Sequence, residues 1–157
     1  MTDVALRPVE DADLDALFAQ MSDPESVWMA AFTPRDPADR AAFEAHMKRV
    51  LASPDTTLLA VTRDGDLVGS IGCFVMDGET DITYWVDRAV WGQGIASRAV
   101  AAFLEVVTER PLYGRAASDN LGSLAVLRRA GFRELRTEIS YANARGTEIE
   151  ETVLRLE

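Results

Sequence analysis

Apolar residues recur along the chain with two different spacings. Leu14, Leu17, Phe18 and Met21 return at steps of three and four residues, which predicts a helix over residues 11–21. Short apolar runs between Gly, Pro and Asp clusters predict strands. In chain order the pattern predicts a strand at 4–8, helices at 11–21 and 36–53, strands at 56–63, 67–76 and 81–86, a helix from 95, a strand at 112–118, a helix at 119–131, and strands at 132–142 and 147–156.

Capping residues set the expected limits of the helices. Asp36 is the predicted N-cap of the second helix, with Pro37 at its first position. Asp119 or Asn120 can cap the last helix, and Gly131 suits its C-terminal end. The segment 22–26 is expected to break the first helix. In the helix that starts at residue 95, one apolar face is predicted, made of Ile95, Ala99, Phe103 and Val106.

The order strand-helix-helix-strand-strand-strand-helix-strand-helix-strand-strand predicts an α+β (mixed α/β) fold. With 157 residues, the chain is long enough for one full core and short for two. We therefore expect a single domain over residues 1–157. No apolar run approaches the ~20 residues that a membrane span needs, and the acidic start does not read as a signal peptide.

Charge and cysteine content narrow the possible functions. The net charge of −10 argues against nucleic acid as a general partner. Only residues 88–136 are net positive, with eight bases and four acids. The single cysteine, Cys73, lies in an apolar run and reads as an inert buried thiol. A single cysteine excludes an internal disulfide framework and a metal site built from several cysteines. His46 has no second histidine to pair with, so we expect no metal site.

The stretch AVWGQGIASRA, residues 89–99, puts Gly92 and Gly94 just before a predicted helix. The unpaired N–H groups and the dipole of a helix N-terminus attract anions, and glycines let an anion approach the backbone. Close packing of the helix on its strand would equally call for small residues. The stretch lacks the Lys-Ser/Thr ending of a Walker loop and the position of a dinucleotide fingerprint.

Two motifs in order carry a family resemblance. YWVDRAVWGQGIASRAV (84–100) resembles the pyrophosphate loop of the GNAT N-acetyltransferase superfamily, and NLGSLAVLRRAGF (120–132) resembles the second motif of its RimJ/RimL-type branch. Trp91 stands where many members have Arg or Gln, as is typical of that branch. The resemblance implies the GNAT fold, a mostly antiparallel sheet splayed between its fourth and fifth strands, with acetyl-CoA as co-substrate.

The resemblance also implies a cofactor site. Backbone near Trp85 and Val86 would bond the pantetheine arm and polarise the acetyl carbonyl. Asn120 would bond the same arm, and Arg129 would meet the 3′-phosphate, with Arg128 and Arg98 as further candidates; ordinary surface charge is the alternative for these arginines. The pyrophosphate would lie on the N–H groups of Trp91, Gly92, Gln93, Gly94, Ile95, Ala96 and Ser97, and the Gln93 side chain is a further candidate to help bind it.

Catalytic roles carry over with one departure. Many members have a general-acid tyrosine seven residues after the asparagine, and here that position is Leu127. Ser123 and a helix N-terminus could stabilise the thiolate instead. Asp81 is the candidate base, and Glu79 either shares this role or is a turn carboxylate. For the acceptor wall the candidates are Trp28, Met29, Phe32 and Tyr141, with simple packing as the alternative for Trp28 and Phe32.

The sequence therefore predicts an N-acetyltransferase that moves an acetyl group to a primary amine, on a protein N-terminus or a small molecule, by direct attack. Two alternatives stay open, a non-catalytic acyl-CoA sensor and a nucleotide-binding regulatory module. We expect a cytoplasmic protein, monomeric or homodimeric, without nucleic-acid or membrane partners. The scarcity of lysine, Lys48 alone against 15 arginines, is typical of a GC-rich bacterial genome.

Overall fold

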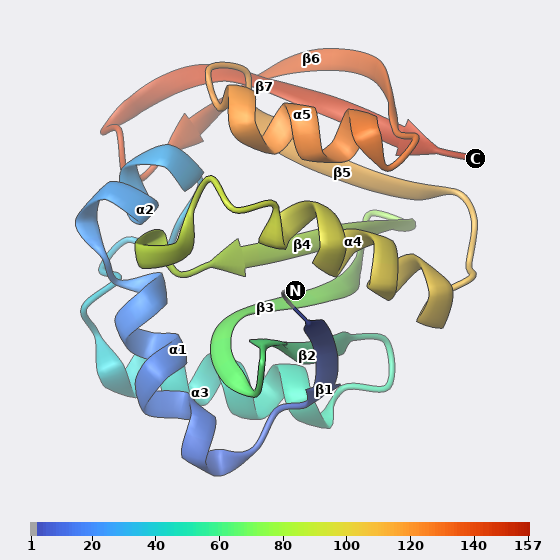
Figure 1. Cartoon of the computed structure of the whole chain (residues 1–157). Coiled ribbons are helices and arrows are strands. Elements are labelled where there is room, and N and C mark those ends of the chain that lie inside the picture. The colour runs from blue at the N-terminus through green and yellow to red at the C-terminus, as the bar shows by residue number, and fades with distance from the viewer. Residues whose placement is uncertain (1–2) are drawn as a thin grey trace.

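A seven-stranded sheet forms the centre of the molecule (Figure 1). The computed structural model describes residues 3–157. The sheet order is β1-β2-β3-β4-β5-β7-β6, and every neighbouring pair is antiparallel except β4 and β5. The strands are β1 (Val4–Pro8), β2 (Thr57–Arg63), β3 (Asp66–Met76), β4 (Glu79–Val86), β5 (Leu112–Ala117), β6 (Arg133–Ala142) and β7 (Thr147–Leu156).

Helices cover both faces of this sheet. In Figure 1, α4 and α5 lie in front of the central strands. Their apolar sides bury Phe103 and Leu127 against β4 and β5. Trp85 of β4 points to the other face, where its indole N–H donates to the Gln20 carbonyl of α1 at 2.9 Å. The helices are α1 (Leu14–Met21), α2 (Pro24–Ala30), α3 (Arg40–Ala52), α4 (Ile95–Val106) and α5 (Leu121–Arg129), with 3₁₀ turns η1 (Asp11–Asp13) and η2 (Arg88–Val90).

The pairing of β4 with β5 is short. Only Asp81 with Tyr113 and Ile82 with Gly114 are in register, and beyond them the strands part. The edge of β4 at residues 83–86 therefore faces open space where a strand partner would otherwise lie. α4 connects the two strands as the crossover that a parallel pair requires. The predicted GNAT fold, with its splay between the fourth and fifth strands, is confirmed.

Three details of the sequence prediction were wrong. Residues 22–26 do not only break α1, because Asp23 caps a separate helix, α2, with Pro24 at its first position. The N-cap of α3 is Asp39, whose carboxylate accepts from the Ala42 N–H at 3.0 Å, whereas Asp36 closes the preceding turn. The Val106 side chain is 64% exposed and does not extend the apolar face of α4. Within residues 3–157, no helix combines the length and apolar character needed to cross a membrane.

Candidate active site

A groove of about 580 Å³ lies on the α4–α5 face, where β4 leaves β5. It gathers most of the predicted cofactor residues from two separate segments. They are Trp85, Val86, Trp91, Gly92, Gly94, Ile95, Ala96, Ser97, Asn120, Ser123 and Arg129. Met29 of α2, which the sequence suggested for the acceptor wall, also lines this groove. Residues that the sequence did not single out complete its walls, namely Ser26 and Ala30 from α2, together with Tyr84, Val90, Gly122, Ala125 and Val126.

The loop before α4 has the backbone that an anion site needs. Gly92 and Gly94 have φ values of +78° and +75°, which side chains rarely allow, and a Cβ at either position would meet nothing within 4 Å. Gly94 is the N-cap of α4. The Ser97 hydroxyl in the first turn is buried without a hydrogen-bond partner among residues 3–157. Free N–H groups, the helix dipole and this hydroxyl together fit a phosphate group.

Basic side chains near the groove differ in their partners. Arg129 lines the groove and makes no ion pair with another residue of the described chain, whereas Arg128 pairs with Glu134 at 3.5 Å. The Gln93 side chain does not line the groove, because its carbonyl oxygen accepts a hydrogen bond from Arg63 at the end of β2. The expectation that the Gln93 side chain helps to bind pyrophosphate is therefore not supported, and Arg63 brings an additional cation to the loop.

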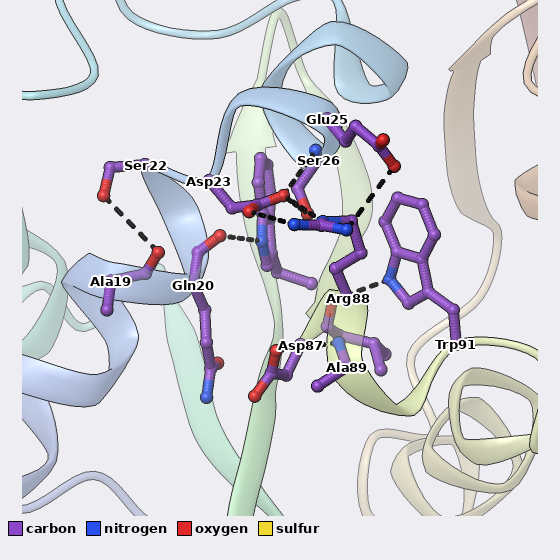
Figure 2. Close-up of polar contacts among 12 residues, drawn as sticks. Ala19, Gln20, Ser22, Asp23, Glu25, Ser26, Asp87, Arg88, Ala89 and Trp91 are labelled. Carbon is purple, nitrogen blue, oxygen red and sulfur yellow. Dashed lines mark hydrogen bonds and ion pairs between the residues drawn. The ribbon is translucent and has the colours of Figure 1, made fainter.

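A set of polar contacts fixes α2 and the loop relative to β4 (Figure 2). Arg88 of η2 reaches Asp23 with two hydrogen bonds, at 2.8 and 3.1 Å. The hydrogen bonds from this guanidinium and from the Ser26 N–H hold the pKa of Asp23 down at about 2. The Trp91 indole turns back and donates to the Val86 carbonyl at 2.9 Å. The loop entrance and the edge of β4 are therefore held as one unit.

The start of α5 carries a compact polar cluster. Asn120 caps the helix by accepting from the Ser123 N–H at 3.1 Å and donates to the Met29 carbonyl at 3.3 Å, so it also ties α2 to α5. The Ser123 hydroxyl lies 2.7 Å from the Tyr84 hydroxyl. Burial raises the pKa of Tyr84 to about 12. Leu127 is 1% exposed and packs on Gly114 of β5, so its side chain belongs to the core.

A second hollow, of about 430 Å³, lies on the other face of the sheet over β4, β5, β7 and β6. Arg115 is at its centre, within 4 Å of four carboxylates that belong to Glu79, Asp81, Glu138 and Glu151. The shortest of these contacts is 2.9 Å, to Glu138. The hollow is lined by Phe32, Met76, Asp77, Glu79, Arg115, Arg136, Glu138, Ser140 and Glu151.

Asp81 lies beside this hollow and is only 2% exposed. Neither of its oxygens has a hydrogen-bond partner among the described residues, and its Oδ2 is 3.6 Å from Arg115 Nε. Burial raises the pKa of Asp81 to about 6, the nearby Arg115 cation opposes this rise, and the charges of Glu79 and Glu151 add to it. A carboxylate in this state is poised to accept a proton near neutral pH.

The predicted catalytic residues fall on opposite faces of β4. Because side chains alternate along a strand, Asp81 faces Arg115, whereas Tyr84 faces Ser123 of α5. Asp81 and Ser123 therefore lie on opposite faces of β4. Glu79 is the first residue of β4 and lines the second hollow, where its carboxylate lies 3.6 Å from Arg115.

The four acceptor candidates are not brought together, and Met29 lines the groove instead. Phe32 lines the second hollow. Trp28 is 54% exposed and stacks under Arg145, whose guanidinium carbon is 4.5 Å from the ring centre. Tyr141 is exposed and lies next to Ser140, so strand alternation turns it away from the face that Ser140 lines. Neither Trp28 nor Tyr141 lines either cavity.

Sequence reasoning missed Arg115, Glu138 and Glu151, which are scattered over three strands. Strand alternation in the sequence indicates which residues of each strand share a face. Which of them meet depends on the pairing register of β5, β7 and β6, which only the structure supplies. Within residues 3–157, no group of three or more His, Cys, Asp or Glu side chains is arranged to hold a metal ion.

Comparison with known proteins gives one family and many similar folds. A family described as an acetyltransferase (GNAT) domain matches residues 3–133. No curated protein matches the sequence significantly. The structure of Mycobacterium smegmatis RimJ in complex with CoA-disulfide is similar, with a TM-score of 0.82, 24% identity, and coverage of 98% of this chain and 81% of that one.

Two further structures show the same fold at low identity. A ribosomal-protein-alanine N-acetyltransferase from Brucella melitensis has a TM-score of 0.81 and 21% identity, and the match covers 97% of this chain and 98% of that chain. Vibrio cholerae spermidine N-acetyltransferase, in complex with CoA and spermine, has a TM-score of 0.80 and 15% identity, with coverage of 98% and 94%. At these identities the likeness concerns the fold alone.

Proposed function

This chain belongs to the GNAT acetyltransferase family, and we propose that it is an acetyl-CoA-dependent N-acetyltransferase whose acceptor is a primary amine. The observation that carries the proposal is the arrangement around β4. A groove with the backbone geometry of an anion site lies on one face. A buried carboxylate with a raised pKa, that of Asp81, lies on the other face, in the paired part of β4 two residues before its unpaired edge begins. Such an edge lets a bound thioester on one face meet an amine from the other.

The groove residues take up the cofactor in this proposal. The N–H groups from Trp91 to Ser97 hold the pyrophosphate, and the Ser97 hydroxyl gives it an otherwise unused donor. Arg129 is left to meet the 3′-phosphate. The edge of β4 at residues 83–86 supplies backbone groups for the pantetheine amides and for polarising the acetyl carbonyl.

Asp81 acts as the general base. An amine must lose its proton to attack, which at pH 7.5 costs about 0.4 kcal/mol for an α-amine of pKa ~7.8 and about 4 kcal/mol for a lysine of pKa ~10.4. The attacking nitrogen forms a bond to the acetyl carbon, the carbon–sulfur bond breaks, Asp81 takes the amine proton directly or through water, and the thiolate leaves with the electron pair. A carboxylate of pKa about 6 is ionised and basic enough for this task at pH 7–8.

The second hollow is proposed as the acceptor site. Four acidic and two basic side chains line it, and Asp81 adds a further acid beside it. This surplus of negative charge favours a cationic acceptor over an anionic one. A protein N-terminal α-amine and a small-molecule amine both satisfy this requirement. A cytoplasmic setting, where acetyl-CoA is made, belongs to the same proposal.

Two measurements test the function. We expect CoA and acetyl-CoA to raise the melting temperature, and ATP and NAD to leave it unchanged; stabilisation by ATP or NAD instead would favour the nucleotide-binding alternative. Thiol release from acetyl-CoA should then appear on addition of an acceptor from a panel of amines, N-terminal peptides and aminoglycosides. Binding of CoA without thiol release across this panel would favour a non-catalytic sensor.

A further inference from the structure

Tyr84 is the phenol that faces the predicted leaving-group side of the groove. It lines the groove from β4, and its hydroxyl lies 2.7 Å from Ser123 Oγ and 3.2 Å from the Ser123 carbonyl. Leu127, at the position where the family resemblance leads one to expect a tyrosine, is buried in the core against Gly114. A phenol therefore reaches the same helix from the strand.

The two hydroxyls have one proton each, which allows two arrangements. In the first, Tyr84 donates to the Ser123 carbonyl and accepts the Ser123 proton, so that neither proton is available to the groove. In the second, Tyr84 donates to Ser123 Oγ, and the serine proton is free to point into the groove. A negative charge that develops in the groove favours the second arrangement, because a donor to an anion forms the stronger hydrogen bond.

We propose that Tyr84 is a positioning residue that holds Ser123 as a hydrogen-bond donor toward the departing CoA thiolate. This inference rests on the proposed acetyltransferase function. The carbon–sulfur bond breaks, its electron pair stays on sulfur, and the chain of donors runs from Tyr84 to Ser123 to the thiolate. No bond to either hydroxyl proton breaks.

The relative acidities decide between donation and full proton transfer. Burial raises the pKa of Tyr84 to about 12, whereas a free thiol has a pKa of ~8.5. Passing the proton to the thiolate would therefore be unfavourable by a factor of roughly 3,000. The pair stabilises the thiolate by hydrogen bonding, and the sulfur takes its final proton from solvent after release.

Binding of the product provides a test that does not depend on turnover. A stabilised thiolate lowers the pKa of the bound CoA thiol, so CoA affinity should rise with pH relative to desulfo-CoA, which has no thiol. Calorimetry from pH 7 to 9 should show a gain of roughly sixfold for the unmodified protein, as expected for a bound thiol whose pKa lies about one unit below the free value of ~8.5. Ser123→Ala should abolish this gain, and Tyr84→Phe should reduce it roughly threefold.

Kinetics should follow the same pattern. Ser123→Ala should lower kcat roughly 10-fold and Tyr84→Phe roughly threefold, with the KM for acetyl-CoA unchanged. The double variant should be no slower than Ser123→Ala, because Tyr84 acts through Ser123. Tyr113→Phe is the matched control, since this tyrosine of β5 lines neither cavity, and it should behave as the unmodified protein.

Three outcomes would overturn the inference. In the first, Tyr84→Phe leaves the pH-dependent gain in affinity and kcat unchanged. In the second, it weakens the binding of CoA and desulfo-CoA equally at every pH, which indicates a role in packing alone. In the third, the double variant is slower than Ser123→Ala, so that the two effects on kcat multiply. These results differ from failure of the proposed function, in which the unmodified protein binds no CoA or releases no thiol with any acceptor.

Discussion

The two cavities beside β4 are built by different means. The groove on the α4–α5 face is formed largely by two sequence segments, and its central features are backbone N–H groups, two glycines with positive φ and one exposed arginine. The hollow on the other face is formed largely by charged side chains from β4, β5, β6 and β7 and from the β3–β4 turn, arranged around Arg115. One cavity relies on backbone shape, and the other relies on the balance of buried charge.

This difference has a consequence for how each cavity should respond to change. Backbone donors do not titrate, so binding in the groove should depend on loop conformation and salt and little on pH. The carboxylates around Arg115 do titrate, so acceptor chemistry should depend on pH and on single charges. The following changes test this contrast from the largest expected effect to the smallest.

Asp81→Asn should have the largest effect on activity. Removing a general base costs about 10²–10⁴-fold, and we expect kcat/KM to fall by at least 100-fold at pH 7. The unmodified enzyme should lose activity as the pH falls through about 6, where Asp81 takes up a proton, and the variant should lack this limb. At pH values above the pKa of the acceptor amine the loss should shrink, because the amine is already neutral.

Kinetic pH profiles from pH 5 to 9.5 provide the measurement. Glu150→Gln is the control, because this exposed acid of β7 lies outside the hollow and its loss changes the net charge equally. If Asp81→Asn keeps the full activity and the acidic limb, the hollow does not supply the base.

The same substitution should stabilise the protein. The pKa of Asp81 is about 6 in the folded state, above its ordinary value of 3.8, so the folded state binds the proton more tightly than the unfolded one. Raising the pH through this window therefore costs the folded state up to about 3 kcal/mol. Asparagine cannot ionise, so the variant should gain up to that amount at pH 7 and nothing below pH ~4.

Urea unfolding at pH 4 and pH 7 measures this difference. A variant less stable than the unmodified protein at pH 7 would show that Arg115 stabilises the ionised Asp81 by more than burial costs. The hollow would then be a structural ion cluster, and the contrast with the groove would be lost.

Gly94→Val tests the groove at its backbone. A β-branched residue at a φ of +75° is strained, and its side chain would project into the open space where the anion is expected. We expect acetyl-CoA binding to weaken 10-fold or more, at all pH values. Gly146→Val in the β6–β7 turn is the matched control, since its φ is +66° and its Cβ would also meet nothing within 4 Å.

Calorimetry with acetyl-CoA distinguishes the two variants. Both should lose similar stability from backbone strain, and only Gly94→Val should lose affinity. Equal affinities in the two variants would remove the pyrophosphate assignment from this loop.

Arg129→Ala should have a smaller effect on the same cavity. Losing one exposed charge-assisted contact to the 3′-phosphate should cost on the order of 1 kcal/mol, or about fivefold, toward acetyl-CoA. Affinity for dephospho-CoA should hardly change, because that ligand lacks the 3′-phosphate. Arg128→Ala is the control, since Arg128 is already paired with Glu134. An equal loss for both ligands would show that Arg129 binds another part of the cofactor.

The sequence predicted the groove far better than the hollow, for a physical reason. Glycines, caps and helix starts act over a few residues, so the loop at 91–97 and the cap at Asn120 could be read directly. Arg115 and Glu151 are separated by 36 residues and meet only through the pairing of β5 with β7. Local sequence patterns do not determine how strands pair in register, so the cluster around Arg115 could not be predicted from the sequence.

Errors within the helices have an equally local cause. Asp23-Pro24 and Asp36-Pro37 carry the same start signal, yet only the first begins a helix, because Asp39 provides a competing cap three residues later. The missed α2 matters for the site, since Met29 and Ala30 form one wall of the groove. Strand alternation places Tyr84 on the same face of β4 as Ile82 and Val86. Its contact with Ser123 could not be predicted, because it depends on how α5 packs on the sheet.

Cys73→Ala should have the smallest effect of all, and it tests whether either cavity uses a covalent intermediate. Cys73 is 7% exposed in the core between β2 and β4, lines neither cavity, and has a pKa raised by burial. A thiol in that state is a poor nucleophile, because the thiolate is the reactive form. Direct attack of the amine on the thioester needs no acetyl-enzyme, so kcat/KM should stay within about twofold of the unmodified enzyme, while stability drops by about 1 kcal/mol from the lost packing. Mass spectrometry after incubation with acetyl-CoA should find no acetyl group on Cys73. A stable acetyl-cysteine, or loss of most activity in the variant, would replace the two-cavity mechanism with one that passes through the core.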